Sequence, residues 1–119
     1  MAITVFKSPL VKGGWWINCY ATDATGGEEL HPAPSTGKAL AITRVMINLF
    51  EDTNITIGGG LVGNGVMHPV VGPMDLTVET LYDLELTNAI ILPEKQALVV
   101  DTSLAKVFVL NVEVQEVDV

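Results

Sequence analysis

The sequence predicts an all-β fold, an antiparallel β-sandwich of jelly-roll type with almost no helix. Its 11 glycines, 6 prolines and many Val, Ile and Thr residues favour strands and turns. Apolar residues come in short runs separated by turn signals, and residues 110–115 alternate between apolar and polar, with Phe108 in phase. Many short strands of this kind are typical of a sandwich or barrel. A chain of 119 residues can bury such a core in one domain.

The first third of the chain contains two predicted strands and a long loop. Residues 3–6 form a short apolar run, which Ser8-Pro9 and Gly13-Gly14 then separate from a second strand at residues 15–20. Residues 22–34 are rich in Thr, Gly, Glu and Pro and are predicted to be a loop.

The longest strand signal spans residues 38–50, and neither of its faces is polar throughout. Its β-branched residues favour a strand over a helix. A strand covered on one side by a second sheet and on the other by a neighbouring subunit would show this pattern. If Leu40, Ile42, Met46 and Phe50 faced water, they would form a patch that monomers rarely expose, so we expect self-association into a closed homo-oligomer.

The remaining elements follow from the same signals. Residues 51–54 form a turn, residues 55–57 a short strand ended by three glycines, and residues 61–73 a loop with brief β segments. Further strands are expected at residues 76–81, 89–92 and 96–102. The residues expected to supply most of the core are Leu40, Ile42, Val45, Ile47, Val78, Ile90, Val99, Phe108, Leu110, Val112 and Val114.

Charge excludes several classes of function. The net charge is −8 and no basic cluster occurs, which argues against nucleic acid and against anionic membranes as partners. No apolar run is long enough for a membrane-spanning helix, and no secretory signal is expected. Cys19 is the only cysteine, so no intramolecular disulfide can form, and a reducing cytosol fits.

No catalytic motif or cofactor site is expected. His31 and His68 each precede a proline and lack the spacing of metal ligands, so a metal-binding cupin-like protein is the weakest alternative. No serine lies in a G-x-S-x-G motif. Cys19 lies in an aromatic, apolar strand, where a buried thiol is expected rather than a reactive one.

The tandem Trp15-Trp16 is the most unusual feature of the sequence. Adjacent strand residues face opposite ways, so one Trp can be in the core and the other exposed. An exposed Trp could anchor a subunit interface or stack on a sugar. A carbohydrate-binding module that uses Trp15 or Trp16 with Asp or Asn side chains is therefore the main alternative to an assembly protein.

Residues 1–14 are predicted to be an attachment arm, and residues 15–119 the sandwich domain. The first 22 residues contain Lys7 and Lys12 but no acidic residue, so this segment could meet an acidic neighbour. Ile3 and Val5 could add a strand to a free sheet edge of that neighbour. The alternative is that residues 3–6 are the first strand of the chain's own sandwich.

Residues 37–48, with a Gly-Lys-Ala-Leu opening, and the later segments 92–103 and 107–112 resemble small β-sandwich proteins of bacteriophage structural modules. These are capsid decoration (cement) proteins and head-fibre components. The resemblance covers residues 37–117 and rests on the spacing of the strands along the chain and on the placement of the turns. It implies a non-enzymatic virion protein, made in the host cytoplasm, that binds the major capsid protein or another virion protein as a homo-oligomer, with a trimer favoured. The interface residues expected on this basis and from the patterns above are Ile3, Val5, Lys7, Lys12, Trp15, Trp16, Met46 and Phe50.

Overall fold

The computed structural model describes residues 3–61, 65–79 and 81–119, and every regular element in these ranges is a β-strand. The strands are β1 (Ile3–Pro9), β2 (Trp15–Ala21), β3 (Glu28–His31), β4 (Lys38–Leu49), β5 (Thr53–Gly60), β6 (Val66–Leu76), β7 (Leu81–Ile91), β8 (Ala97–Thr102) and β9 (Phe108–Asp118). Residues 1–2 of the expected arm, 62–64 of the expected loop and Thr80 of the expected strand 76–81 lie outside the described residues. Across those same ranges, no helix is long and apolar enough to cross a membrane.

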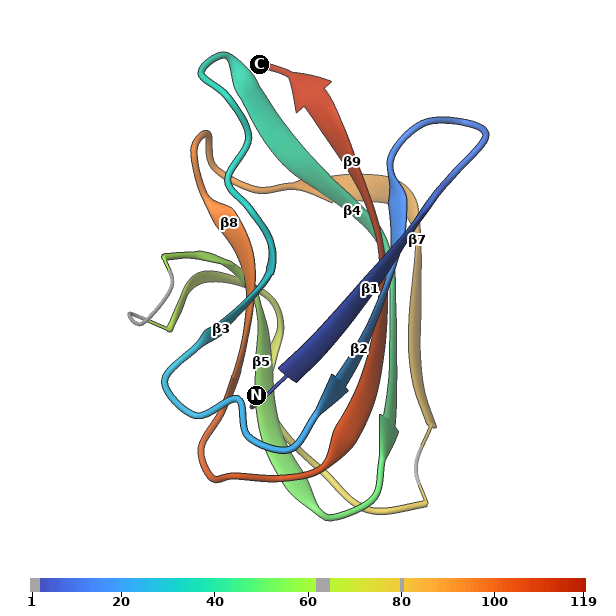
Figure 1. The fold of residues 1–119 in the computed structure, drawn as a ribbon, viewed down its shortest axis with the longest axis vertical. Helices are drawn as coiled ribbons and strands as arrows, with labels where there is room; N and C mark the ends of the chain where they lie inside the picture. Colours follow the sequence, from blue (N-terminus) through green and yellow to red (C-terminus); the bar gives the residue numbers. More distant parts are fainter. Residues whose placement is uncertain (1–2, 62–64, 80) are drawn as a thin grey trace.

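The strands form two antiparallel sheets that pack face to face (Figure 1). The five-stranded sheet has the order β1-β2-β9-β4-β7, and the four-stranded sheet has the order β3-β8-β5-β6. β9, the last strand of the chain, lies at the centre of the larger sheet, between β2 and β4.

Strand pairing is nested. β2 pairs with β9, β3 with β8, β4 with β7 and β5 with β6, and every pair is antiparallel. The chain from β2 to β9 is therefore one long ribbon, closed by the β5–β6 hairpin, whose strand pairs alternate between the two sheets. This is the eight-stranded arrangement of a jelly roll, to which β1 adds a ninth strand beside β2. The predicted jelly-roll sandwich is confirmed.

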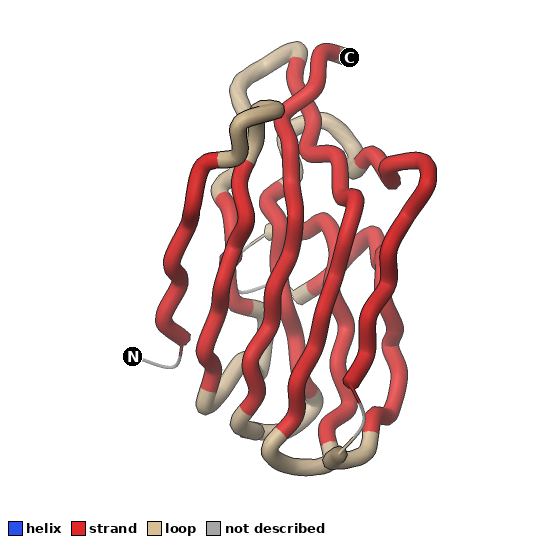
Figure 2. The backbone as a smooth tube through the Cα atoms, turned by 90° about the vertical axis from the view of Figure 1, so that its right-hand side faces the viewer, coloured by secondary structure: helices blue, strands red, loops and turns tan. Residues whose placement is uncertain are grey.

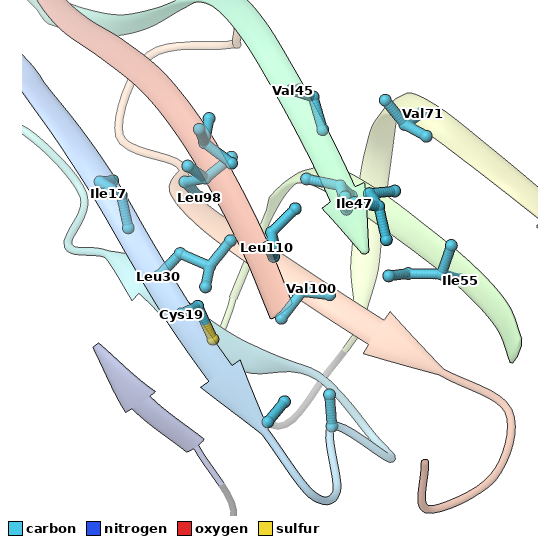
Figure 3. Packing of buried hydrophobic residues seen from close by; sticks show 14 of the residues in the cluster. Ile17, Cys19, Leu30, Val45, Ile47, Ile55, Val71, Leu98, Val100 and Leu110 are labelled. Atoms are coloured by element: carbon cyan, nitrogen blue, oxygen red, sulfur yellow. The ribbon is translucent and has the colours of Figure 1, made fainter. Parts of the chain in front are cut away.

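The core lies between the sheets. The alternation predicted for the C-terminal segment buries Phe108, Leu110 and Val112 from β9 in the core cluster. Figure 3 shows Leu110 in this cluster with Leu98 and Val100 of β8. Nine of the eleven predicted core residues are buried.

Two of the predicted core residues are exposed instead, so these predictions were wrong. Val78 lies in the turn between β6 and β7, because residues 76–81 are the end of one strand and the start of the next. Ile90 lies on β7, which no further strand covers.

A β-bulge in β4 explains why both of its faces looked apolar. Ile42 pairs with Val114 and Arg44 with Glu113, so Thr43 is an extra residue on β4. The bulge shifts the alternation by one residue, so Leu40 and Ile42 face the core before it and Val45 and Ile47 after it. Even and odd positions thus face the core in turn, and the large apolar residues of β4 reach it from a single face. Ala39 and Ala41 are also buried, although they do not belong to the core cluster.

Three strands were missed or shortened by the sequence prediction. β3 lies within the expected loop 22–34, and β6 occupies most of the expected loop 61–73. β6 contains Pro69 and Pro73, which an edge strand tolerates because only one of its sides pairs. β7 begins at Leu81, eight residues before the predicted run 89–92.

The glycines after residue 57 extend β5 rather than end it. Their lack of a side chain allows β6 to approach closely, since a Cβ at Gly58 would lie 2.2 Å from the carbonyl oxygen of His68. Any other residue here would push β6 away from β5.

Candidate functional site on the outer face of the five-stranded sheet

Figure 2 shows the five-stranded sheet in front, with the side turned away from the four-stranded sheet, here called the outer face, toward the viewer. The register of its strands places aromatic and polar side chains together on this outer face. Antiparallel pairing places opposite residues side by side on the same face. Three rows cross all five strands from β1 to β7: Thr4, Tyr20, Val109, Asn48 and Leu81; Phe6, Asn18, Asn111, Met46 and Asp83; and Ser8, Trp16, Glu113, Arg44 and Glu85.

One side of the outer face is aromatic. Phe6 of β1 is 71% exposed and Tyr20 of β2 is 48% exposed, while Trp16 of β2 is half-buried. Phe6 lies opposite Asn18, so Trp16 and Tyr20 are its diagonal neighbours within side-chain reach. We call these three residues the aromatic region. Exposed aromatic side chains are enriched at binding surfaces, because they bury large areas with little loss of conformational freedom.

An amide pair continues the aromatic region toward the centre of the sheet. Asn18 Nδ2 donates a hydrogen bond to Asn111 Oδ1 over 3.0 Å. Each amide has more donors and acceptors than this bond uses. The two side chains can therefore hydrogen-bond to a molecule that covers the outer face.

The other side of the outer face is charged. The guanidinium of Arg44 donates two hydrogen bonds to Asp83, from Nε over 3.1 Å and from Nη2 over 2.9 Å. This bidentate pair lowers the pKa of the Asp83 carboxyl and raises the pKa of Arg44.

Glu113 joins the N-terminal segment to the charged side. Its Oε1 accepts hydrogen bonds from Lys12 Nζ and, over 2.8 Å, from Thr43 Oγ1. The hydrogen bond from Lys12 is the main reason that the pKa of Glu113 lies below its usual value.

A cavity of about 310 Å³ opens where the ladder between β4 and β7 is interrupted. On β4 only Thr43 lies between the paired residues Ile42 and Arg44, whereas on β7 residues 86–89 lie between their partners Ile90 and Glu85. Figure 2 shows β7, the last strand of this sheet, bending away from its neighbour. The lining residues are Lys12, Thr43, Arg44, Glu85, Leu86, Thr87 and Glu113.

The structure separates the predicted site residues into two groups. Lys12, Trp16 and Met46 lie on the outer face. The four others from the first two strands, Ile3, Val5, Lys7 and Trp15, alternate with the outer residues and face the other sheet. Phe50 is exposed in the turn after β4, beyond the rows.

Lys7 meets a partner from the other sheet inside the sandwich. Its Nζ lies 2.9 Å from Nδ1 of the buried His31 of β3, and a charged ammonium can only donate, so the imidazole accepts. The ring of Trp15 packs on His31 with 4.8 Å between ring centroids. Burial, and then the charge of Lys7, lower the pKa of His31 to about 4. His31 is therefore neutral at pH 7 and joins the two sheets.

Residues 3–9 form the edge strand β1 of the chain's own sheet, paired with β2 along its whole length. Ile3 is buried and belongs to the core cluster. This is the alternative arrangement weighed against a free arm. The positive charges of the segment also have partners in the same chain, since Lys12 pairs with Glu113.

The patch expected to drive self-association does not exist as predicted. Leu40 and Ile42 are fully buried in the core because of the bulge at Thr43, so they need no subunit to cover them. Met46 is half-buried on the outer face, and only Phe50 is fully exposed.

The expected burial of Cys19 is confirmed, and desolvation raises the pKa of its thiol to about 12. His68 lies on β6, where its Nδ1 is 2.8 Å from Gln96 Oε1. In the described part of the chain, no group of three or more His, Cys, Asp or Glu side chains is placed to hold a metal ion.

A second cavity, of about 370 Å³, lies at one end of the sandwich, next to the start of β5 and the end of β6. Its polar lining includes Asp52, Asn54, Asp75, Ser103 and Lys106. Two of these side chains already bind each other, because Asn54 Nδ2 donates to Asp75 Oδ1 over 2.9 Å. Among the described residues, neither this cavity nor the one between β4 and β7 is lined by an aromatic side chain.

Comparison with protein-family models and with curated proteins finds no match to this chain.

Proposed function

We propose that this protein is a structural protein that assembles with copies of itself on the surface of a larger particle, as virion capsid decoration proteins do. The jelly-roll fold supports the proposal because viral capsid domains share it, although lectin domains and cupins do so too. The resemblance of residues 37–117 to phage decoration proteins supports the virion as the particle and a trimer as the oligomer.

The observation that carries self-assembly is the aromatic region. Phe6 and Tyr20 are among the exposed large apolar side chains, and they lie beside Trp16 on one nearly continuous sheet surface. Covering them removes apolar surface from water, at about 25 cal/mol per Å².

Charge favours a second copy as the partner that covers Phe6 and Tyr20 of the aromatic region. The chain carries a net charge of −8, so two copies repel each other over most of their surfaces. The first 22 residues, which include β1 and β2, contain no acidic residue. The aromatic region therefore lies where an acidic copy meets the least repulsion.

The double variant Phe6→Ser/Tyr20→Ser tests self-assembly. Analytical ultracentrifugation at micromolar concentration should show an oligomer for the unchanged protein and a monomer for the double variant. Leu104→Ser is the matched control, since Leu104 is an exposed leucine in the loop after β8 and should leave the oligomer intact. A monomeric unchanged protein, or an oligomeric double variant, would contradict self-assembly through this face.

Immuno-electron microscopy tests the particle. Antibodies to the purified protein should label the capsids of phage particles released by the source cells. Particles that contain no copy of this chain, by labelling and by mass spectrometry, would refute the virion assignment while leaving self-assembly intact.

A further inference from the structure

The cavity between β4 and β7 is built by two irregularities of the fold. The bulge at Thr43 and the unpaired residues 86–89 interrupt the same ladder at the same place. Interrupted pairing leaves backbone groups without a ladder partner and lets side chains enter the gap between the strands. A volume of about 310 Å³ lies at the small end of ligand pockets, which span roughly 300–1,000 Å³.

The lining of this cavity fits a ligand that is polar and carries no net charge. Lys12 and Arg44 bring two positive charges, and Glu85 and Glu113 bring two negative charges. Three of these four groups are already engaged, as Lys12 bonds Glu113 and Arg44 bonds Asp83. An ionic ligand would have to displace these pairs, whereas a hydroxyl group can donate to a carboxylate and accept from a cation at once.

Trp16 stands beside this lining. It lies directly opposite Glu113 on the outer face, and Glu113 in turn lies opposite Arg44. Trp16 is half-buried and is not itself a lining residue, but the part of its indole that remains accessible offers an apolar surface for the C–H groups of a ring. The third row of the outer face thus presents an aromatic residue, an acid, a base and an acid in sequence.

We infer that this cavity binds one ring of a neutral carbohydrate, whose hydroxyl groups bond Arg44, Glu85 and Glu113 and whose apolar side faces Trp16. The inference goes beyond self-assembly and does not depend on it. The second cavity, of similar size but at the end of the sandwich and away from the row that contains Trp16, provides the internal comparison.

The test uses the full chain and a panel of neutral monosaccharides and disaccharides, first on a glycan array and then by NMR titration. Glu85→Ala removes a hydrogen-bond acceptor, and Trp16→Leu removes the aromatic surface. Each should weaken binding about tenfold or more, the effect of roughly 1.4 kcal/mol. Asp75→Ala in the second cavity is the matched control and should bind as the unchanged protein does.

Circular dichroism and the melting temperature of each variant separate lost binding from lost folding. Glu85→Ala is the decisive variant because Glu85 is exposed on an edge strand. It should also keep the oligomeric state of the unchanged protein, so a failure of this inference is distinguishable from a failure of self-assembly. The inference is overturned if no neutral saccharide binds, if only acidic saccharides or zwitterions bind, or if Glu85→Ala binds as tightly as the unchanged protein.

Discussion

The two edges of the five-stranded sheet are built in opposite ways. At the β1 edge, the ladder to β2 runs without a shift, and Lys7 reaches across to His31 of the other sheet. At the β7 edge, the ladder to β4 breaks, and Leu81 and Ile91 remain exposed. The β1 edge thus has a polar contact, between Lys7 and His31, inside the sandwich. The β7 edge has its polar side chains on the outer face, around the cavity.

This difference indicates that the β1 edge contributes to the stability of the fold and that the β7 edge is available for binding. A continuous edge buries side chains, so a substitution there changes the free energy of unfolding of the whole domain. A bulged edge has less buried surface and more exposed backbone, which is typical of binding regions. Substitutions at the β1 edge should therefore change the free energy of unfolding, and those at the β7 edge should change binding.

Deletion of residues 2–12 should have the largest effect. It removes β1 and with it the burial of Ile3 and Val5, which we expect to lower the free energy of unfolding by about 3 kcal/mol or more. Urea denaturation followed by tryptophan fluorescence measures the loss. Phe6→Ser, on the outer side of the same strand, should change stability little. A truncated protein as stable as the full chain would show that β1 is an arm after all.

Acidification should weaken the β1 edge through His31. The folded protein binds a proton there only near pH 4, whereas the unfolded chain binds it near pH 6.5. The unfolded state thus holds more protons between these values, so stability falls as the pH drops through this window, by up to about 3 kcal/mol.

The groups facing His31 are Lys7, Trp15 and Glu116, with Glu29 near Lys7. Denaturation midpoints measured from pH 7 to pH 4 should fall steeply for the unchanged protein and for His68→Gln. His31→Gln should flatten that part of the profile, and an unaltered profile in this variant would exclude His31 as the cause.

The two lysines of the N-terminal segment should respond unequally. Lys7→Ala leaves Nδ1 of the buried His31 without its donor and should lower the free energy of unfolding by about 1–3 kcal/mol. Lys12→Ala breaks a mostly exposed ion pair with Glu113 and should lower it by less than about 1 kcal/mol. Equal losses in the two variants would contradict the difference between a buried and an exposed contact.

Thr87→Ala at the β7 edge should have the smallest effect on stability, within about 0.5 kcal/mol, because Thr87 is exposed beside an interrupted ladder. Differential scanning calorimetry measures it. A large loss would mean that the residues around this cavity support the fold rather than a ligand.

The sequence predicted the strands whose alternation is undisturbed. Residues 108–115 and 15–20 show period two because each has one face on the core, and the structure confirms both. In β4 the same signal was masked by a single extra residue, Thr43, since a bulge exchanges the two faces. The missed strand β7 does alternate, with Asp83 and Glu85 between Tyr82, Leu84 and Leu86, and this pattern could have revealed it.

The candidate site was predictable only in part. The tandem tryptophans singled out Trp16, and the absence of acidic residues from the first 22 positions singled out Lys12. Trp16 lies on the outer face and Lys12 lines its cavity. Arg44, Glu85 and Glu113 are far apart in sequence, and only the register of three strands brings them into one row. Burial of Lys7 against His31 likewise depends on how the two sheets face each other, which no local pattern contains.

The nested pairing of strands also determines when the chain can fold. β9 is the last strand to be synthesised, yet it forms the middle of the five-stranded sheet, between β2 and β4. Until it is present, the facing edges of β2 and β4 have no partner and are open to pairing with other chains. Folding of this sandwich therefore waits until β9 has been made and proceeds through contacts between distant segments, which makes it slow. A ribosome that stalls before residue 108 leaves a chain that aggregates rather than half a domain that is stable.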